Sequence, residues 1–303
     1  MNLHSRPVNT LAPEPDIARS IDRLAERVNV LIDRLDLNRH AIGPPDWTAS
    51  TAFRARRRGG VLRIEPVLHV GSIRLSDLRE VDAQRDKLVR NTAQFVAGKP
   101  ANNVLLTGAR GTGKSSLIKG CLNAFASQGL RLIEIDKTDL IELPELVELV
   151  AQRPERFVLY CDDLSFEDGD AGYKALKSAL DGSVAQSSEN VLIYATSNRR
   201  HLLPERMRDN LSATYTDDGE LHPGEVVEEK ISLSERFGVW ISFYPFSQDE
   251  YLCIVTQWLQ HFGVRDGDIA AARTASLVWA LERGSRSGRV AYQFARDLAG
   301  RTL

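Results

Sequence analysis

The sequence has few of the features that mark metal-binding, secreted or membrane proteins. Its three cysteines, Cys121, Cys161 and Cys253, are scattered through apolar segments without the spacing of metal ligands, so we interpret them as small hydrophobic residues. The N-terminal segment lacks an apolar run of signal-peptide length, and no later run approaches the length of a membrane helix. We therefore expect a cytoplasmic protein with no membrane segment.

An excess of charge of one sign is also missing. The 303 residues include 39 Lys and Arg against 41 Asp and Glu, which gives a formal net charge of -2. A basic field over the whole chain is thus excluded, and any contact with nucleic acid would have to come from a local patch. Hydrophobic residues make up 43% and charged residues 26%, which is typical of soluble globular proteins. The length favours one large domain with a smaller companion.

Residues 108–115 match the phosphate-loop pattern G-x-x-x-x-G-K-[ST] and directly follow the apolar run Val104–Leu106. Glycines let such a loop bend until its backbone N–H groups converge on phosphate oxygens. We expect Lys114 to reach the β- and γ-phosphates, and Ser115, at the start of the next helix, to ligate Mg²⁺. ATP and Mg²⁺ are the expected cofactors. The predicted nucleotide-binding residues of this segment are Gly108, Ala109, Arg110, Gly111, Thr112, Gly113, Lys114, Ser115 and Ser116.

Apolar segments on either side of this loop alternate between strand and helix patterns. Four further runs, rich in β-branched or aromatic residues, are predicted as strands: Leu130–Ile135, Phe157–Cys161, Val191–Ala195 and Val239–Phe243. Helical patterns separate them, which indicates a doubly wound α/β core with a parallel sheet covered on both faces. After Pro245 the periodicity is helical to the end, which predicts a small all-helical C-terminal unit.

The N-terminal region carries two features with open interpretations. Apolar residues spaced four and three apart predict an amphipathic helix over 17–35, which either docks on the chain's own core or pairs with another subunit. Residues 38–60 read as a loop containing Trp47, Phe53 and the basic cluster Arg54, Arg56, Arg57 and Arg58. Basic residues beside aromatics occur in nucleic-acid sites, and also as a solvated face.

Two adjacent carboxylates, Asp162 and Asp163, end the predicted strand 157–161. This is the form of a Walker B motif, in which Asp162 would hold the Mg²⁺ shell and Asp163 would orient the attacking water. Paired acids after a strand also serve as helix caps or solvated turns. Downstream of a phosphate loop we favour the catalytic interpretation.

Asn198 follows the next predicted strand, and this order of motifs resembles that of the AAA+ ATPases. The resemblance implies a P-loop NTPase fold, with a parallel sheet in an α/β/α core and a C-terminal helical lid. It also implies that Asn198 acts as sensor 1, contacting the nucleophilic water or the γ-phosphate. Arg236 resembles the arginine finger that a neighbouring subunit supplies, with Arg206 and Arg208 as competitors and a structural salt bridge as the alternative. Arg289, with Arg286 as competitor, resembles sensor 2.

The resemblance runs from about Leu75 to the C-terminus and is strongest with a bacterial group of predicted ATP-binding AAA+ proteins of unknown function. Stretches such as Cys161–Phe166 and Arg286–Arg289 carry it. The implied organisation is an N-terminal tail, helix and basic segment over 1–70, a nucleotide-binding domain over 71–246 and a lid over 247–303. One departure is Asp163, where AAA+ enzymes usually have Glu, so hydrolysis could be slow.

Two classes of function follow from these observations. The first is an ATPase, homo-oligomeric when ATP is bound, that uses hydrolysis to drive or switch remodelling of an unidentified protein client. The alternative is an ATP-dependent regulatory module, similar to helicase loaders, which acts on protein or single-stranded DNA with slow turnover. A small-molecule kinase shares the phosphate loop, but it would not explain Asn198 and Arg236.

Overall fold

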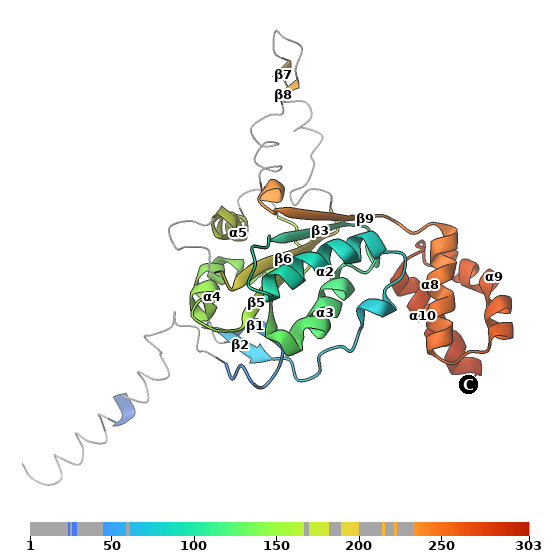
Figure 1. Cartoon of the computed structure of the whole chain (residues 1–303), viewed down its shortest axis with the longest axis horizontal. Helices are drawn as coiled ribbons and strands as arrows, with labels where there is room; N and C mark the ends of the chain where they lie inside the picture. The colour runs from blue at the N-terminus through green and yellow to red at the C-terminus, as the bar shows by residue number, and fades with distance from the viewer. Residues whose placement is uncertain are drawn as a thin grey trace, which may run out of the picture. The chain divides into compact units, whose positions relative to one another are not determined.

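A seven-stranded sheet forms the centre of the computed structural model (Figure 1). The structure describes residues 24, 26–28, 45–58, 61–166, 170–181, 189–199, 214–215, 221–222 and 233–302. By its contacts the chain divides into Met1–Ala41 and Ile42–Leu303. In the first unit, Leu24 and residues 26–28 are helical and exposed; the rest of the helix predicted over 17–35 lies outside the described residues.

The strand order of the sheet is β2-β1-β4-β5-β6-β3-β9. Five strands, all parallel, agree with the sequence-based expectation: β3 (Val104–Gly108), β4 (Leu130–Ile135), β5 (Arg156–Cys161), β6 (Val191–Ser197) and β9 (Val239–Phe243). β6 lies between the phosphate-loop strand β3 and the strand β5 that precedes the paired acids. The carboxyl ends of parallel strands meet at one edge of a sheet, so the three predicted motifs converge there.

Helices cover both faces of this sheet, as the apolar strands predict. On one face lie α2 (Asp82–Val96) and α3 (Lys114–Phe125), in front of the sheet in Figure 1. On the other lie the short helix η3 (Lys137–Glu142), α4 (Leu143–Val150) and α5 (Ala171–Asp181). The buried side chains accordingly form two hydrophobic clusters, one on each face. The prediction of a three-layer α/β core is confirmed.

Residues expected to form a loop instead extend the sheet. β1 (Ala52–Arg58) runs parallel to β4 and pairs with β2 (Val61–Pro66) in an antiparallel hairpin. The prediction of a loop over 38–60 is therefore wrong at 52–58. Phe53 and Ala55 are fully buried on one face of β1, so the strand buries alternate apolar residues even though arginines occupy most other positions.

Most of the basic cluster on β1 is matched by carboxylates. Arg54 pairs with Glu134 of β4 at 2.8 Å, and Arg58 pairs with Glu65 of β2 at 2.6 Å. Arg57 pairs with Glu142 and, at 3.4 Å, with Asp139, both in η3. Arg54 and Arg57 thus link the hairpin to β4 and η3, whereas Arg58 links its two strands to each other.

The C-terminal residues form three helices, which agrees with the predicted helical unit. They are α8 (Gln248–His261), α9 (Asp266–Glu282) and α10 (Gly288–Thr302), seen at the right in Figure 1. Ser247 begins α8 with a capping box, in which its side chain accepts a hydrogen bond from the Glu250 backbone. A separate pair of short strands, β7 (Thr214–Tyr215) and β8 (Leu221–His222), and the short helices η1 (Leu75–Asp77) and η2 (Ala126–Gln128) complete the described elements. Among all the residues that the structure describes, no helix is long and apolar enough to cross a membrane.

Candidate nucleotide site

The phosphate loop lies between the carboxyl end of β3 and the first turn of α3. Gly108 has a φ of +124°, and a Cβ there would lie 1.8 Å from the carbonyl oxygen of Phe243 in β9. Gly111 has a φ of +74°, and its Cβ would lie 2.8 Å from the Ser287 hydroxyl. Only glycine fits at these two positions, because a side chain would meet both strain and neighbouring atoms. The loop is therefore held in shape by β9 on one side and by the lid on the other.

Lys114 opens α3 and points back into the loop. Its ammonium group donates to the carbonyl oxygens of Gly108 and Ala109, each at 2.7 Å, and to the Asn198 side-chain oxygen at 3.1 Å. The side chain is buried, and burial lowers the Lys114 pKa, although the nearby Asp163 and Asp162 carboxylates oppose this shift. A buried cation held mainly by neutral carbonyl groups is well prepared to bind an anionic ligand.

Ser115 and Asp162 provide the oxygen atoms that a divalent cation requires. The Ser115 hydroxyl donates to Asp162 Oδ1 at 2.9 Å, and the Thr196 hydroxyl donates to the same oxygen at 2.6 Å. Burial raises the pKa of Asp162, but the hydroxyl groups of Thr196, Tyr160 and Ser115 outweigh burial, and the net shift is downward. Asp162 is thus held as a carboxylate beside a hydroxyl group, a donor set that suits Mg²⁺.

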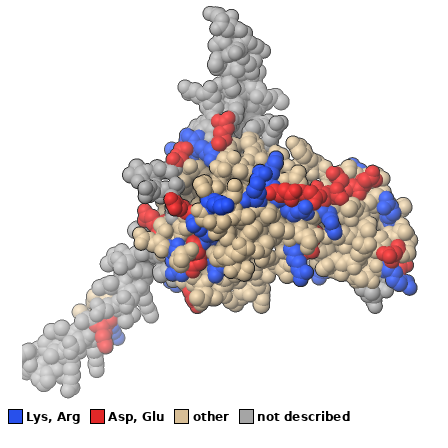
Figure 2. All heavy atoms as spheres, viewed as in Figure 1, with Lys and Arg blue, Asp and Glu red and all other residues tan. Residues whose placement is uncertain are grey.

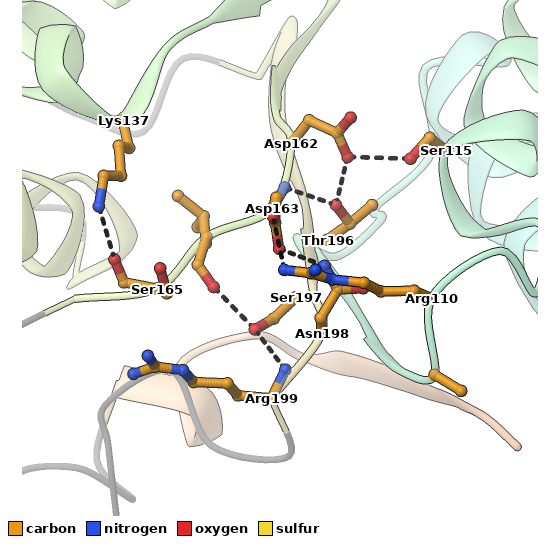
Figure 3. A network of polar contacts seen from close by, with 12 residues as sticks. Arg110, Ser115, Lys137, Asp162, Asp163, Ser165, Thr196, Ser197, Asn198 and Arg199 are labelled. Carbon is orange, nitrogen blue, oxygen red and sulfur yellow. Dashed lines mark hydrogen bonds and ion pairs between the residues drawn. The ribbon is translucent and has the colours of Figure 1, made fainter. Parts of the chain in front are cut away.

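Asp163 lies across from the phosphate loop in a left-handed backbone conformation, with a φ of +52°. Its backbone N–H donates to the Thr196 hydroxyl at 2.9 Å, and its carboxylate accepts from the Asn198 amide. Arg110 points toward the same carboxylate, at 3.9 Å (Figure 3). Asn198 therefore contacts both Lys114 and Asp163, and links the phosphate loop to the second acid.

The lid closes one side of a cavity of about 1030 Å³ that contains these groups. The Arg289 backbone N–H donates to the Gly111 carbonyl at 3.4 Å, and the Arg289 side chain lines the cavity together with Thr112 and Ser116. Further from the loop the wall is aromatic, with the rings of Trp258 and Tyr292 packed edge to face at 4.9 Å. The cavity thus joins a polar phosphate region to an apolar region between the sheet and the lid.

The four other arginines considered from the sequence do not line this cavity within the described residues. Arg236 forms an ion pair with Asp181, at the end of α5, and does not line the cavity. Arg286 is exposed and does not line it either. Arg206 lies outside the described residues, as does Arg208. Among the described arginines of the lid, Arg289 is therefore the one that lines the cavity.

A family model described as "Protein of unknown function (DUF815)" matches residues 48–302. The chain belongs to the DUF815 family. This match covers both the hairpin β1–β2 and the lid. A search of the curated proteins found no match.

Solved structures similar to this DUF815 chain are AAA+ proteins. A variant of RuvB from Thermotoga maritima gives a TM-score of 0.50 at 16% identity, covering 75% of this chain and 64% of RuvB. A second RuvB structure, described as a Holliday junction branch migration motor, gives a TM-score of 0.44 at 16% identity. That alignment covers 71% of this chain and 60% of RuvB. A chain of the HORMA:CdnC:Trip13 complex from E. coli MS115-1 gives a TM-score of 0.44 at 14% identity. That alignment covers 74% of this chain and 90% of the matched chain. The chain thus spans less than two thirds of RuvB, and it has the AAA+ P-loop fold, as the sequence motifs predict.

One residue of the site was not predicted. Thr196 of β6 donates to Asp162 and accepts from the Asp163 backbone, so it fixes both acids relative to each other. The sequence contained a weak signal, because Thr196 lies two residues before Asn198 in the strand that the AAA+ order places beside β5.

Proposed function

We propose that this DUF815 protein is an ATPase that binds Mg²⁺-ATP at the carboxyl edge of the sheet. The observation that carries this proposal is the hydrogen-bonded chain from Lys114 through Asn198 to Asp163, next to the pair Ser115 and Asp162. These residues come from β3, β5, β6 and their following segments, and they all line one cavity. Structural salt bridges alone do not require such a convergence.

Each residue has a distinct role in this proposal. Lys114 and the loop N–H groups bind the phosphates, while Ser115 and Asp162 hold Mg²⁺, which neutralises phosphate charge when bound. Asp163 orients the attacking water, and Asn198 holds that water or the γ-phosphate in place. Arg289 brings positive charge from the lid. A direct test is to measure binding of a fluorescent ATP analogue and phosphate release from Mg²⁺-ATP; protein that binds no nucleotide would contradict the proposal.

Arg236 is proposed to complete the site of a neighbouring subunit in a homo-oligomer. An arginine supplied in trans stabilises charge that develops in the transition state, and is worth about 10³-fold or more in rate. We expect Arg236→Ala to bind ATP normally and to hydrolyse it at least about 10³-fold more slowly. Steady-state phosphate release, with nucleotide affinity measured in parallel, gives both values.

An experiment with mixed variants distinguishes a role of Arg236 in a neighbouring subunit from a purely structural ion pair with Asp181. Subunits with Lys114→Ala lack a working pocket but retain Arg236, so adding them to Arg236→Ala subunits should restore part of the turnover. Asp181→Ala serves as the control for this ion pair, because it removes the Asp181 carboxylate and leaves the arginine. Absence of rescue in demonstrated mixed oligomers would move the assignment to Arg206 or Arg208.

A second candidate function, a regulatory module that binds nucleic acid, is favoured by one feature of the hairpin. Arg56 of β1 and Arg63 of β2 lie directly opposite each other in the register, and both are exposed. Neither has a carboxylate partner among the described residues. Like charges in directly opposed positions destabilise a sheet, whereas a phosphate between them would be favourable. Figure 2 shows basic and acidic residues interspersed over the visible face, so such a contact is local.

The double variant Arg56→Gln/Arg63→Gln tests this second function. Each phosphate contact to a single strand contributes about 0.7 to the slope of log affinity against log salt, so losing two should reduce the slope by about 1.4. Fluorescence anisotropy with a labelled oligothymidylate measures this slope. The matched control is Arg273→Gln/Arg296→Gln, which removes the same charge from exposed positions on the lid. An equal loss in both double variants would contradict a site on the hairpin.

A further inference from the structure

A buried hydroxyl group beside the proposed Mg²⁺ site has no hydrogen bond. Tyr160 is the penultimate residue of β5, and Asp162 directly follows the strand two residues later. The tyrosine is 1% exposed, and its hydroxyl makes no hydrogen bond within the described parts of the chain. Its polar neighbours are Asp162, Ser115 and Thr196, and none of them meets the geometry of a hydrogen bond with it.

The neighbouring strand provides a direct comparison. Tyr194 of β6 is the register partner of Tyr160, is equally buried, and belongs to the same hydrophobic cluster. The Tyr194 hydroxyl lies 2.9 Å from the Thr92 hydroxyl and accepts from the Asn91 amide at 3.3 Å. An unsatisfied buried polar group is costly, and native proteins contain few of them. Phenylalanine at 160 would avoid that cost, so the retained hydroxyl requires an explanation.

The groups around Tyr160 indicate what would satisfy it. Asp162 Oδ1 already accepts from Ser115 and Thr196, whereas water molecules that coordinate a cation can only donate and therefore need acceptors. A tyrosine hydroxyl is protonated at neutral pH, so it can both donate and accept a hydrogen bond. One hydroxyl can thus bond the carboxylate on one side and the hydration shell of the cation on the other.

We propose that Tyr160 is a positioning residue for Mg²⁺, whose hydroxyl donates to Asp162 and accepts from the hydration shell of the bound cation. This inference rests on the proposed function, and deepens it by assigning a role to a residue of the strand that precedes the two acids. Tyr160 gains its hydrogen bonds only when the cation is present, so the free energy lost in the ligand-free protein is recovered on Mg²⁺ binding.

The test is Tyr160→Phe, which removes only the hydroxyl. In ligand-free protein, the melting temperature should rise by about 2–4 °C, because an unsatisfied buried group is removed. In a titration of MgCl₂ at fixed fluorescent ATP analogue, the midpoint should increase about tenfold. Binding of the analogue in EDTA should stay at the wild-type value, because the phosphate contacts are untouched.

Tyr194→Phe is the matched control, since its hydroxyl is already hydrogen-bonded. It should lower the melting temperature and leave the MgCl₂ midpoint unchanged. A fall in the melting temperature of Tyr160→Phe, or an unchanged MgCl₂ midpoint, would overturn the inference while wild-type nucleotide binding still supported the ATPase proposal. Failure of the wild-type protein to bind nucleotide would instead contradict the ATPase proposal itself.

Discussion

Lys114→Ala is expected to abolish ATP binding at concentrations that saturate the wild-type protein. Lys114 is the buried cation of the phosphate loop, and an ammonium–phosphate contact is a charge-assisted interaction. Losing it should weaken binding by at least about 100-fold, equivalent to about 2.7 kcal/mol. Equilibrium titration with a fluorescent ATP analogue measures the loss, and circular dichroism establishes that the variant is folded.

Lys119→Ala is the matched control for this prediction. Lys119 lies on the same helix as Lys114, but its side chain is exposed and does not line the cavity. The control removes the same charge from α3 without touching the loop, so it should bind ATP with nearly wild-type affinity. Unchanged affinity in a folded Lys114→Ala variant, or equal losses in both variants, would exclude the proposed phosphate site.

Asp163→Asn is expected to retain Mg²⁺-ATP and to lose hydrolysis. Asp162 still supplies the metal-side carboxylate, whereas the amide that replaces Asp163 cannot act as a base for water. A positioned general base contributes about 10²- to 10⁴-fold, so phosphate release should fall by at least about 100-fold. Single-turnover and steady-state assays measure this fall, and binding of the ATP analogue should remain within about threefold of wild type.

The backbone at Asp163 makes this substitution a clean one. The residue has a φ of +52°, a conformation that Asn and Asp tolerate better than other residues with side chains. The same geometry gives a physical reason why Asp occupies a position that is usually Glu in AAA+ enzymes. A longer side chain at this position would match the Glu of other AAA+ enzymes and could be expected to raise activity. We expect Asp163→Glu to lose activity instead, because Glu tolerates this backbone conformation less well than Asp. Wild-type turnover in Asp163→Asn would remove Asp163 from the catalytic role.

A variant trapped with ATP bound would also provide a way to find the proposed client. Asp163→Asn protein that holds ATP should remain in the nucleotide-bound state that engages a partner. Proteins that co-purify with this variant, and not with Lys114→Ala, are candidates for the client. The comparison uses one variant that binds nucleotide and one that does not, so it isolates nucleotide-dependent contacts.

The phosphate loop and the paired acids could be predicted because their chemistry is local in sequence. Gly108–Ser115 form a continuous motif, and Asp162 directly follows an apolar strand. The position of Asn198 was predicted from the order of the motifs, because β6 lies between β3 and β5 in the AAA+ arrangement. Contacts that depend on tertiary packing, such as Thr196 with both acids, could not be derived in this way.

The hairpin was not predicted because the interpretation of residues 52–58 relied on their arginines and not on the alternation of apolar residues. Residues 52–58 contain four arginines, and we read them as a basic loop. Phe53 and Ala55 nevertheless alternate with those arginines, and Gly59-Gly60 separates them from a second alternating run over 61–66. Two glycines between alternating runs are a hairpin signal. The alternation of apolar residues was a better guide here than the number of arginines. The charge of Arg57 is matched by Glu142, which is distant in sequence and comes near only in the folded protein.

The Arg236 contact shows a different limit of sequence analysis. Its pairing with Asp181 joins residues that are 55 positions apart, and nothing in either local segment indicates the other. The sequence left a structural salt bridge as an alternative, and the structure provides its partner. The trans role therefore remains a proposal, which the mixing experiment separates from the ion pair.

The contact between Gly111 and the start of α10 is a point about which the lid helix can rotate. Arg289 and Ser287 touch the loop at one end of a helix of 15 residues, which is about 22 Å long at the usual rise of about 1.5 Å per residue. A rotation of about 10° about that contact displaces the far end by about 4 Å over this length. A small rotation of the lid about the loop would therefore produce a larger displacement at the opposite end of α10.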